Sequence, residues 1–169
     1  MRAAAFLDRD GVLMEDRGYV ARAQDVCLLP GTGAALRQLV RAGYLLIVVT
    51  NQSGIGRGLF DEQALQDVHR RLTVLLAAED VLLDAIYHCP HAPAAGCACR
   101  KPLPGLLDEA ASRFPVNRER SFMVGDKPSD VAAGQAAGLG RTYLIGSPGL
   151  PDLLSCVAKQ LALMRVSGS

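Results

Sequence analysis

The chain has 169 residues, a formal net charge of +1 and no Trp, and half of its residues are hydrophobic. This length suits one compact domain, residues 1–169, with enough apolar side chains to bury a core without disulfides. The near-neutral charge and the few aromatic residues argue against a nucleic-acid or membrane partner. The sequence contains no signal-peptide core and no apolar run near the roughly 20 residues of a membrane span. We therefore expect a soluble, cytoplasmic protein, and a monomer.

Strand-like apolar runs alternate with helix-like periodic runs along the chain. The first expected elements are a strand at 3–7 and a helix that ends near Gly43 and has Leu36, Leu39 and Val40 on its apolar side. A strand at 44–49, a helix capped by Asp61 and apolar at Leu65 to Leu76, and a weak strand at 85–87 follow. The rest of the chain is expected to form a helix opened by Pro104, a strand at 122–124, a helix at 129–137, a strand at 142–145 and a terminal helix at 154–164. Such alternation predicts an α/β fold with a doubly wound parallel sheet, covered by helices on both faces.

Polar side chains gather where the expected strands end, and parallel sheets bind ligands at that edge. Asp8 and Asp10 follow the first strand, and Asp126 follows a later one. Carboxylates this close repel each other unless a cation or a proton lies between them, and Mg²⁺ prefers oxygen ligands. A solvated acidic turn explains Asp8 and Asp10 equally well, and a helix cap is the alternative for the segment after Gly125.

Donors for a phosphate group occur in two further segments. Thr50, Asn51, Gln52 and Ser53 follow the strongest strand and offer hydroxyl, amide and backbone donors. The glycines after them do not have the spacing of a nucleotide-binding loop. Arg100 and Lys101 place fixed positive charge just before a helix. Taken alone, these segments could also be a flexible polar loop and a solvated basic pair.

The most specific local pattern consists of three cysteines and one histidine close together near residue 90. Cys89, His91, Cys97 and Cys99 form C-x-H followed by C-x-C, a complete set of ligands for a closed structural Zn²⁺ site. The loop 89–99 has no fold of its own, so a metal ion would order it and orient Arg100 and Lys101. The alternative is a coincidence of four residues in one loop.

Four other residues carry weaker predictions. His69 is expected at the surface, on the polar side of its helix. Cys27 and Cys156 are expected to be packed thiols. His88 either supports the neighbouring zinc ligand or has no role.

Taken in order, DRDG, VVTNQSG, CRKP and GDKPSD resemble the four motifs of the haloacid dehalogenase-like (HAD-like) phosphatases. Three longer segments are similar to one branch of that family, the D-glycero-D-manno-heptose 1,7-bisphosphate phosphatases, with the histidinol-phosphate phosphatases as close relatives. These segments are 16–20, 50–58 and 89–105, and the resemblance runs from about Phe6 to Ile145. The chain departs from the branch at Val12, where Thr is usual, and it has no inserted cap domain.

The resemblance implies a role for each matching residue. Asp8 would attack phosphorus and form an aspartyl phosphate, while Asp10 would act as general acid and then as general base. Asp8, the main-chain carbonyl of Asp10 and Asp126 would hold a catalytic Mg²⁺. Thr50 and Lys101 would stabilise the charge of the phosphoryl group. The residues expected to bind or orient the substrate are Asp16, Arg17, Gly18, Tyr19, Asn51, Gln52, Ser53, Arg57, Arg100 and Lys127.

The function expected from this resemblance is removal of the C7 phosphate of a heptose 1,7-bisphosphate, a step in making lipopolysaccharide or other heptose-containing surface glycans. Hydrolysis of histidinol phosphate is the alternative within the family. A different class of protein, a non-catalytic zinc-stabilised module that binds phosphosugars or a protein, would not need the pair Asp8 and Asp10.

Overall fold

The computed structural model describes residues 1–167 and contains one five-stranded parallel sheet. Its strands, in chain order, are β1 (Ala4–Leu7), β2 (Leu45–Asn51), β3 (Ala85–Cys89), β4 (Phe122–Gly125) and β5 (Arg141–Leu144). They lie in the order β3-β2-β1-β4-β5. The central strand β1 pairs with β2 through Leu7 opposite Val48, and with β4 through Leu7 opposite Val124. This arrangement confirms the predicted α/β fold.

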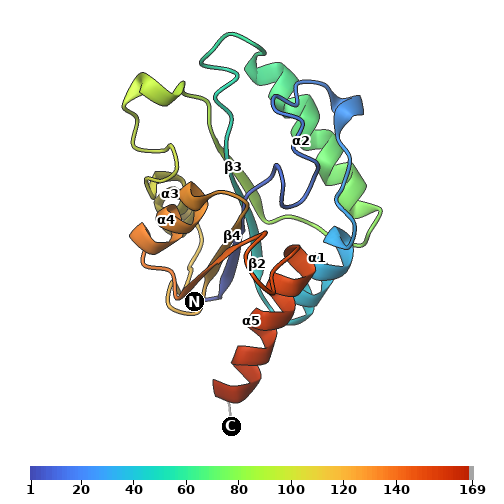
Figure 1. The fold of residues 1–169 in the computed structure, drawn as a ribbon, viewed down its shortest axis with the longest axis vertical. Helices are drawn as coiled ribbons and strands as arrows, with labels where there is room; N and C mark the ends of the chain where they lie inside the picture. The colour runs from blue at the N-terminus through green and yellow to red at the C-terminus, as the bar shows by residue number, and fades with distance from the viewer. Residues whose placement is uncertain (168–169) are drawn as a thin grey trace.

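Helices cover both faces of the sheet, as Figure 1 shows. Their bounds are α1 (Thr32–Arg41), α2 (Glu62–Ala77), α3 (Gly105–Arg113), α4 (Pro128–Ala136) and α5 (Leu153–Ser167), with short 3₁₀ turns η1 (Ala23–Asp25) and η2 (Pro93–Ala95). Side chains alternate along each strand, so Ala5 and Leu7 pack with α1, α2 and α5, while Ala4 and Phe6 pack with α3 and α4. Strands buried on both faces require continuous apolar runs, and that is how they read in the sequence.

The winding of the chain reverses next to β1. The chain adds β2 and β3 on one side of β1, then crosses to place β4 and β5 on the other. Parallel sheets of this type bind ligands outside the carboxyl ends of the strands, where the strand order reverses. Asp8 follows β1, Thr50 is the second-last residue of β2, and Asp126 follows β4. The topology therefore places these three side chains around one crevice.

Local sequence signals set the helix starts. The Asp61 carboxylate accepts a hydrogen bond from the backbone N of Ala64 at 2.8 Å and caps α2, as predicted. Helix α4 has Pro128 in its first turn, and the Asp130 carboxylate accepts a hydrogen bond from the backbone N of Lys127 at 3.0 Å. A proline there loses no helical hydrogen bond, because the first amides of a helix have no partner in any case. The predicted elements are all present, with ends that differ by one to a few residues.

Three predictions about individual side chains are wrong. Val40 is 47% exposed, because α1 buries only the stripe that includes Leu36 and Leu39. His69 is 6% exposed rather than superficial, because its side of α2 faces the loop that follows β1. Cys27 is exposed, whereas Cys156 is buried as expected. Within the described residues, no helix is long and apolar enough to cross a membrane.

Candidate active site

A lysine and three carboxylates form the centre of the site. Lys101 Nζ lies 2.7 Å from Asp8 Oδ1 and 2.6 Å from Asp130 Oδ1, and it donates to the carbonyl of Val49 at 2.8 Å. Asp8, Lys101 and Asp130 are at most 5% exposed. Burial alone would lower the pKa of Lys101, but the neighbouring carboxylates of Asp8 and Asp130 raise it above its usual value. The lysine is therefore charged and binds both carboxylates.

The third carboxylate, Asp126, lacks a partner for one of its oxygens. Ligand atoms from Asp8, Asp126 and Asp130 all lie within 4.8 Å of one another, and Asp126 Oδ1 is buried with no hydrogen-bond partner. Burial, together with the charges of Asp8 and Asp130, raises the pKa of Asp126 to about 6, against the opposing effect of Lys127. Only two of the three converging carboxylates contact Lys101, and a hard divalent cation fits such a group of oxygens.

Gly11 allows the loop after β1 to approach Asp126. Its φ is +78°, and a Cβ at this position would lie 2.3 Å from Asp126 Oδ2. The glycine is thus required both by the left-handed backbone and by the space that the carboxylate occupies. The next residue, Val12, is 1% exposed and packs in the core, so an apolar side chain fills the position where a Thr would be usual.

The Asp10 carboxylate is held separately from the other three. Arg9 Nη2 donates to both Asp10 oxygens at 2.9 Å, Arg9 Nε donates to Oδ1 at 3.2 Å, and Gln52 Nε2 donates to Oδ2 at 3.0 Å. Burial raises the pKa of Asp10, and the charge and hydrogen bonds of Arg9 only partly offset that effect. Gln52 Nε2 also donates to Thr50 Oγ1 at 2.8 Å, which links Asp10 to the end of β2.

Asn51 holds the backbone of Lys101. Its Nδ2 donates to the Lys101 carbonyl and its Oδ1 accepts from the Lys101 amide, both at 3.1 Å. The sequence predicted a substrate contact for Asn51, and the side chain does line the cavity described next. Its two measured hydrogen bonds, however, fix the segment that carries Lys101. Asn51 therefore joins the end of β2 to the loop before α3.

A cavity of about 530 Å³ opens beside Asp10 and Lys101. Its lining is Asp10, Asp16, Gly18, Tyr19, Asn51, Gln52, Ser53, Arg100, Lys101, Pro102, Lys127 and Ser129. Lys127 Nζ lies 3.3 Å from Asp16 Oδ2, so the loop after β1 meets the start of α4 at this cavity. Most residues predicted to bind substrate are thus brought together.

Arg17 and Arg57 are not brought to the cavity. Arg17 is exposed and pairs with Glu15, with 2.6 Å between Nη2 and Oε2. Arg57 is exposed in the turn after β2, where its amide donates to the Ser53 carbonyl at 3.0 Å. Neither residue is among those that line the cavity, so the structure gives these two predictions no geometric support.

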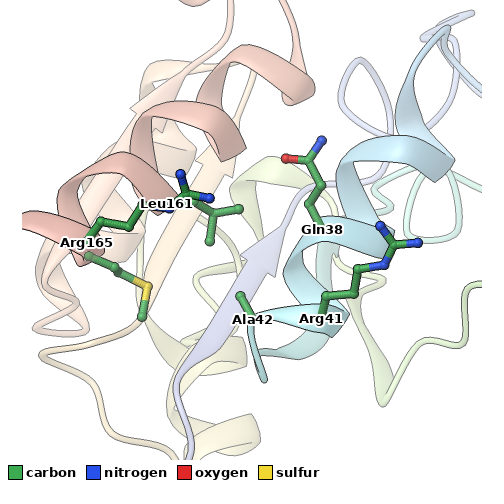
Figure 2. Close-up of a pocket in the computed structure, with 6 residues that line it drawn as sticks. Gln38, Arg41, Ala42, Leu161 and Arg165 are labelled. Carbon is green, nitrogen blue, oxygen red and sulfur yellow. The ribbon is translucent and has the colours of Figure 1, made fainter. Parts of the chain in front are cut away.

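A larger cavity, about 690 Å³, lies between α1 and α5 and is shown in Figure 2. Gln38, Arg41 and Ala42 line it from α1, and Leu161, Met164 and Arg165 line it from α5. The end of α1 leads into the start of β2, so this cavity lies near the amino ends of the strands, whereas Asp8 and Asp126 lie at their carboxyl ends. It has no carboxylate, thiol or histidine in its lining, and we therefore locate the chemistry at the smaller, polar cavity.

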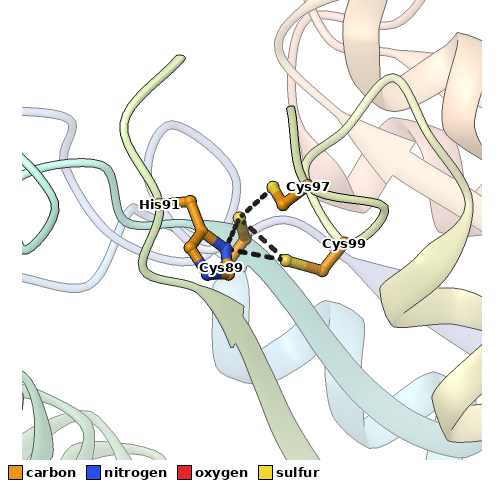
Figure 3. A group of neighbouring side chains, drawn as sticks. All are labelled: Cys89, His91, Cys97 and Cys99. Atoms are coloured by element: carbon orange, nitrogen blue, oxygen red, sulfur yellow. Dashed lines mark hydrogen bonds between the residues drawn. The ribbon is translucent and has the colours of Figure 1, made fainter. Parts of the chain in front are cut away.

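The four predicted zinc ligands converge, as Figure 3 shows. Cys89 Sγ lies 3.1 Å from Cys99 Sγ and 3.6 Å from Cys97 Sγ, and His91 Nδ1 lies 3.2 Å from Cys99 Sγ and 3.5 Å from Cys89 Sγ. A tetrahedral zinc with bonds of 2.0–2.3 Å needs edges of roughly 3.3–3.8 Å between its ligands. Two of the four distances, 3.5 and 3.6 Å, lie in that range, and the other two, 3.1 and 3.2 Å, are slightly shorter, so the four side chains come close to tetrahedral zinc geometry with all four positions supplied by the protein.

The loop 89–99 is tied to the site by backbone contacts. The amides of Gln52 and Gly56 donate to the carbonyls of Cys89 and Pro90, both at 2.8 Å. A Cβ at Gly56 would lie 2.4 Å from the Ala92 amide nitrogen, so only glycine permits this approach. The loop after β2 and the cysteine loop thus support each other, and Arg100 and Lys101 follow directly.

Two residues that matter for the geometry were not predicted. For Asp130, the sequence predicted only a helix cap in the segment after Gly125. This residue does accept a hydrogen bond from the backbone N of Lys127 at the start of α4, and it also binds Lys101. Its place four residues after Asp126, in the segment that follows β4, was the available signal. Arg9 was not considered at all. An arginine between two aspartates that share a buried site is a signal for an internal ion pair, because buried carboxylates require partners.

Comparison with known proteins agrees with this geometry. A HAD-hydrolase-like family model matches residues 98–147. The chain is 42% identical to the D-glycero-beta-D-manno-heptose-1,7-bisphosphate 7-phosphatase of Haemophilus ducreyi, with 85% of this chain and 83% of that protein covered. It is 41% identical to the enzyme of the same name from Escherichia coli K12, with coverage of 88% and 83%.

Solved structures give the same result. The crystal structure of D,D-heptose 1,7-bisphosphate phosphatase from B. bronchiseptica, complexed with magnesium and phosphate, is 35% identical and has a TM-score of 0.85, with 95% of this chain and 98% of that chain covered. A putative HAD-like phosphatase from Mesorhizobium loti is also 35% identical, with a TM-score of 0.82 and coverage of 94% and 87%. The chain therefore belongs to the D-glycero-beta-D-manno-heptose-1,7-bisphosphate 7-phosphatase family of HAD-like phosphoric monoester hydrolases.

Proposed function

We propose that this enzyme removes the C7 phosphate of D-glycero-D-manno-heptose 1,7-bisphosphate through an aspartyl-phosphate intermediate on Asp8. The observation that carries the proposal is the contact of one buried lysine with two carboxylates, Asp8 and Asp130, next to the unpaired Asp126. The family relatives named above, at 41–42% identity over most of the chain, support the choice of substrate.

In the first half of the reaction, an Asp8 carboxylate oxygen attacks phosphorus and the bond from phosphorus to the sugar oxygen breaks. The Asp10 carboxyl donates its proton to that oxygen, and the heptose 1-phosphate leaves. In the second half, the Asp10 carboxylate takes a proton from a water molecule whose oxygen attacks phosphorus. The bond from Asp8 to phosphorus then breaks, releasing inorganic phosphate and restoring both side chains.

Lys101 and Thr50 have a supporting role in this proposal. The Lys101 ammonium is charged and touches Asp8, so it stands beside the phosphoryl group during transfer and opposes its negative charge. The Thr50 hydroxyl, held by Gln52, is available to the same oxygens. In phosphoryl transfer most of the catalysis comes from such positioning and charge stabilisation, because the negative charge spread over the phosphoryl oxygens must be stabilised while the attacking and leaving oxygens are held in line.

A magnesium ion would be held by Asp8, Asp126 and the main-chain carbonyl of Asp10, with Asp130 beside them. When bound, Mg²⁺ supplies the positive charge that keeps the nucleophile and the phosphate dianion together. The unpaired Asp126 Oδ1 supports this assignment. Zn²⁺ would be bound by the four ligands around Cys89 and would serve as a structural ion that orders the loop before Arg100.

The cavity supports a small, highly charged substrate. Arg100 and Lys127 offer positive charge for a second phosphate, and Asp16, Tyr19 and Ser53 offer hydrogen-bonding groups for sugar hydroxyls. No inserted cap covers the cavity in the described part of the chain, so the sugar would bind in an open groove. The expectation of a cytoplasmic monomer belongs to the same proposal, and light scattering of the purified protein tests the oligomeric state.

The decisive experiment compares phosphate release from the heptose 1,7-bisphosphate and from histidinol phosphate, with Mg²⁺ and with EDTA. We expect release of one phosphate per heptose bisphosphate, dependence on Mg²⁺ and a much lower kcat/KM for histidinol phosphate. A preference for histidinol phosphate would keep the chemistry and refute the substrate. No release from either compound or from a generic aryl phosphate would refute the phosphatase and leave the non-catalytic binding module.

A further inference from the structure

Arg9 is the largest completely buried side chain among the described residues. Removing a guanidinium from water is strongly unfavourable unless its charge and its N–H groups find partners. Arginines that bind phosphorylated ligands are usually reached from solvent, yet Arg9 has no exposed surface and does not line the cavity. Its charge must therefore act on another protein group.

The partners of Arg9 are Asp10 and Gln52. Its Nε and Nη2 donate to the two Asp10 oxygens at 2.9–3.2 Å, and Nη2 also reaches Gln52 Oε1 at 3.2 Å. Gln52 Nε2 then returns a hydrogen bond to Asp10 Oδ2 at 3.0 Å. The three side chains thus bind one another in a closed triangle, in which the Asp10 carboxylate accepts hydrogen bonds from Arg9 and from Gln52.

Within residues 1–167, no other residue near Arg9 competes with Asp10 and Gln52 for its Nε and Nη2 groups. His69 is buried next to Arg9, and burial together with the charge of Arg9 lowers the pKa of its imidazole to about 3. His69 Nε2 and Arg9 Nη1 are both buried without a hydrogen-bond partner. The charge of the arginine thus acts on a neutral imidazole, which offers no competing negative charge, and its Nε and Nη2 are directed at Asp10.

We propose that Arg9 is a positioning residue that, together with Gln52, fixes the Asp10 carboxyl for proton transfer to and from the sugar oxygen. The inference rests on the proposed function, because it assigns Arg9 a task in that reaction. A flexible Asp10 would sample several rotamers, whereas a bidentate guanidinium allows one planar arrangement. Proton transfer requires donor and acceptor to be within hydrogen-bond distance in a fixed orientation.

This role predicts a loss that depends on the leaving group. A sugar alkoxide is a poor leaving group and needs the Asp10 proton as its bond to phosphorus breaks. The p-nitrophenolate ion is stable enough to leave without one. For the first half-reaction, loss of positioning should therefore affect the sugar phosphate and spare the aryl phosphate. The second half-reaction needs Asp10 as a base for both substrates, so dephosphorylation of Asp8 should slow for both.

The test uses Arg9→Met, with Arg22→Met as the control. Arg22 is exposed, pairs with Asp25 and does not line the cavity, so its replacement removes the same charge without touching the site. For Arg9→Met, kcat/KM on the heptose bisphosphate should fall by about 10²-fold, in the range of general acid catalysis, with KM within about threefold. On p-nitrophenyl phosphate, kcat/KM should change by less than about threefold. Rapid mixing should show a burst of about one p-nitrophenol per enzyme.

Equal losses on the two substrates, a loss confined to KM, or no loss would overturn the proposal. If Arg9→Met fails to fold, Arg9→Lys carries the same comparison, because lysine keeps the charge but lacks the fork. Its loss on the sugar phosphate should be about tenfold, again without a matching loss on the aryl phosphate. Wild-type enzyme that releases no phosphate from any ester would refute the proposed function instead, which separates the two failures.

Discussion

The two side-chain clusters that suit metal ions are built in opposite ways. The Cys89 cluster lies within one loop, residues 89–99, and its ligands are close because they are near in sequence. The carboxylate cluster joins Asp8 after β1 to Asp126 and Asp130 around the start of α4, from opposite halves of the chain. The sheet holds the carboxylates in place before any ion arrives, whereas the cysteine loop has little apolar core of its own. We therefore expect the carboxylate cluster to determine catalysis and the cysteine cluster to determine local order.

The largest expected effect comes from Asp8→Asn. An amide is not a nucleophile, so turnover of the heptose bisphosphate should fall at least about 10³-fold. The replacement has the same shape, and Asp130 still pairs with Lys101, so the melting temperature should change little. Phosphate release and thermal unfolding measure both quantities. Asp67→Asn, at an exposed position on α2, is the matched control. Full activity in Asp8→Asn would contradict the assignment of the nucleophile.

The next effect concerns the cysteine loop. Cys99→Ser should reduce bound zinc from about one ion per chain to near zero and lower the melting temperature by roughly 4–8 °C, corresponding to about 2 kcal/mol. Activity should fall only about tenfold, because Asn51 still holds the Lys101 backbone after the loop loosens.

Cys27→Ser is the control for this change, since Cys27 is exposed and lies outside the cluster. Elemental analysis, calorimetry and phosphate release give the three readouts. If Cys99→Ser lost activity as completely as Asp8→Asn, the cysteine cluster would have to act in catalysis itself, and the contrast between the two clusters would fail.

The connection between the clusters can be tested at Asn51. Asn51→Leu removes two hydrogen bonds to the Lys101 backbone, each worth about 1 kcal/mol, and should lower kcat about tenfold with a smaller change in KM. Zinc content should stay at the wild-type value. Gln63→Leu on the exposed surface of α2 serves as a control. A rise in KM with unchanged kcat would instead assign Asn51 to substrate binding alone.

The smallest effect is on stability and depends on pH. His69 is buried on α2, with its ring centroid 5.9 Å from that of His88, the residue before Cys89. Burial, with the charges of Arg9 and His88, lowers the pKa of His69 from 6.5 to about 3 in the folded protein. The unfolded chain therefore binds an extra proton below pH 6.5. The stability contributed by the neutral ring is complete above that pH and is lost as the pH falls towards 3, at up to about 1.4 kcal/mol per pH unit.

His69→Phe removes this titration. Between pH 6.5 and pH 5, the wild-type protein should lose about 2 kcal/mol more of its unfolding free energy than the variant does. Urea unfolding at the two pH values, monitored by circular dichroism, measures the difference. Equal losses in the two proteins would show that the histidine is protonated in the folded state or that its surroundings relax to admit water.

The positions of the elements were predictable because their signals are local. The strands read as apolar runs, Asp61 and Pro104 mark helix starts, and the four candidate zinc ligands have a spacing that a single loop can close. Predictions failed where the burial of a side chain depends on which segment packs against it. Val40 and His69 both lie on amphipathic helices, and only the packing of those helices decides which edge of the apolar stripe is covered. Arg57 lies in the predicted loop yet points to solvent, since a loop's sequence does not fix its direction.

What the sequence by itself determined is the fold class, the order of the strands along the chain, the cluster of candidate zinc ligands and the family motifs. Each of these depends on residues close together in sequence or on patterns that any parallel sheet must satisfy. Only the tertiary structure decided that Asp130 shares Lys101 with Asp8, that Asn51 holds the Lys101 backbone, and that Arg9 is buried behind Asp10. The contacts of Lys101 join the segment before α3 to residues that are distant in sequence, after β1, at the end of β2 and in α4. Arg9 and Asp10 are neighbours in sequence, but the burial of Arg9 depends on the segments that pack around it.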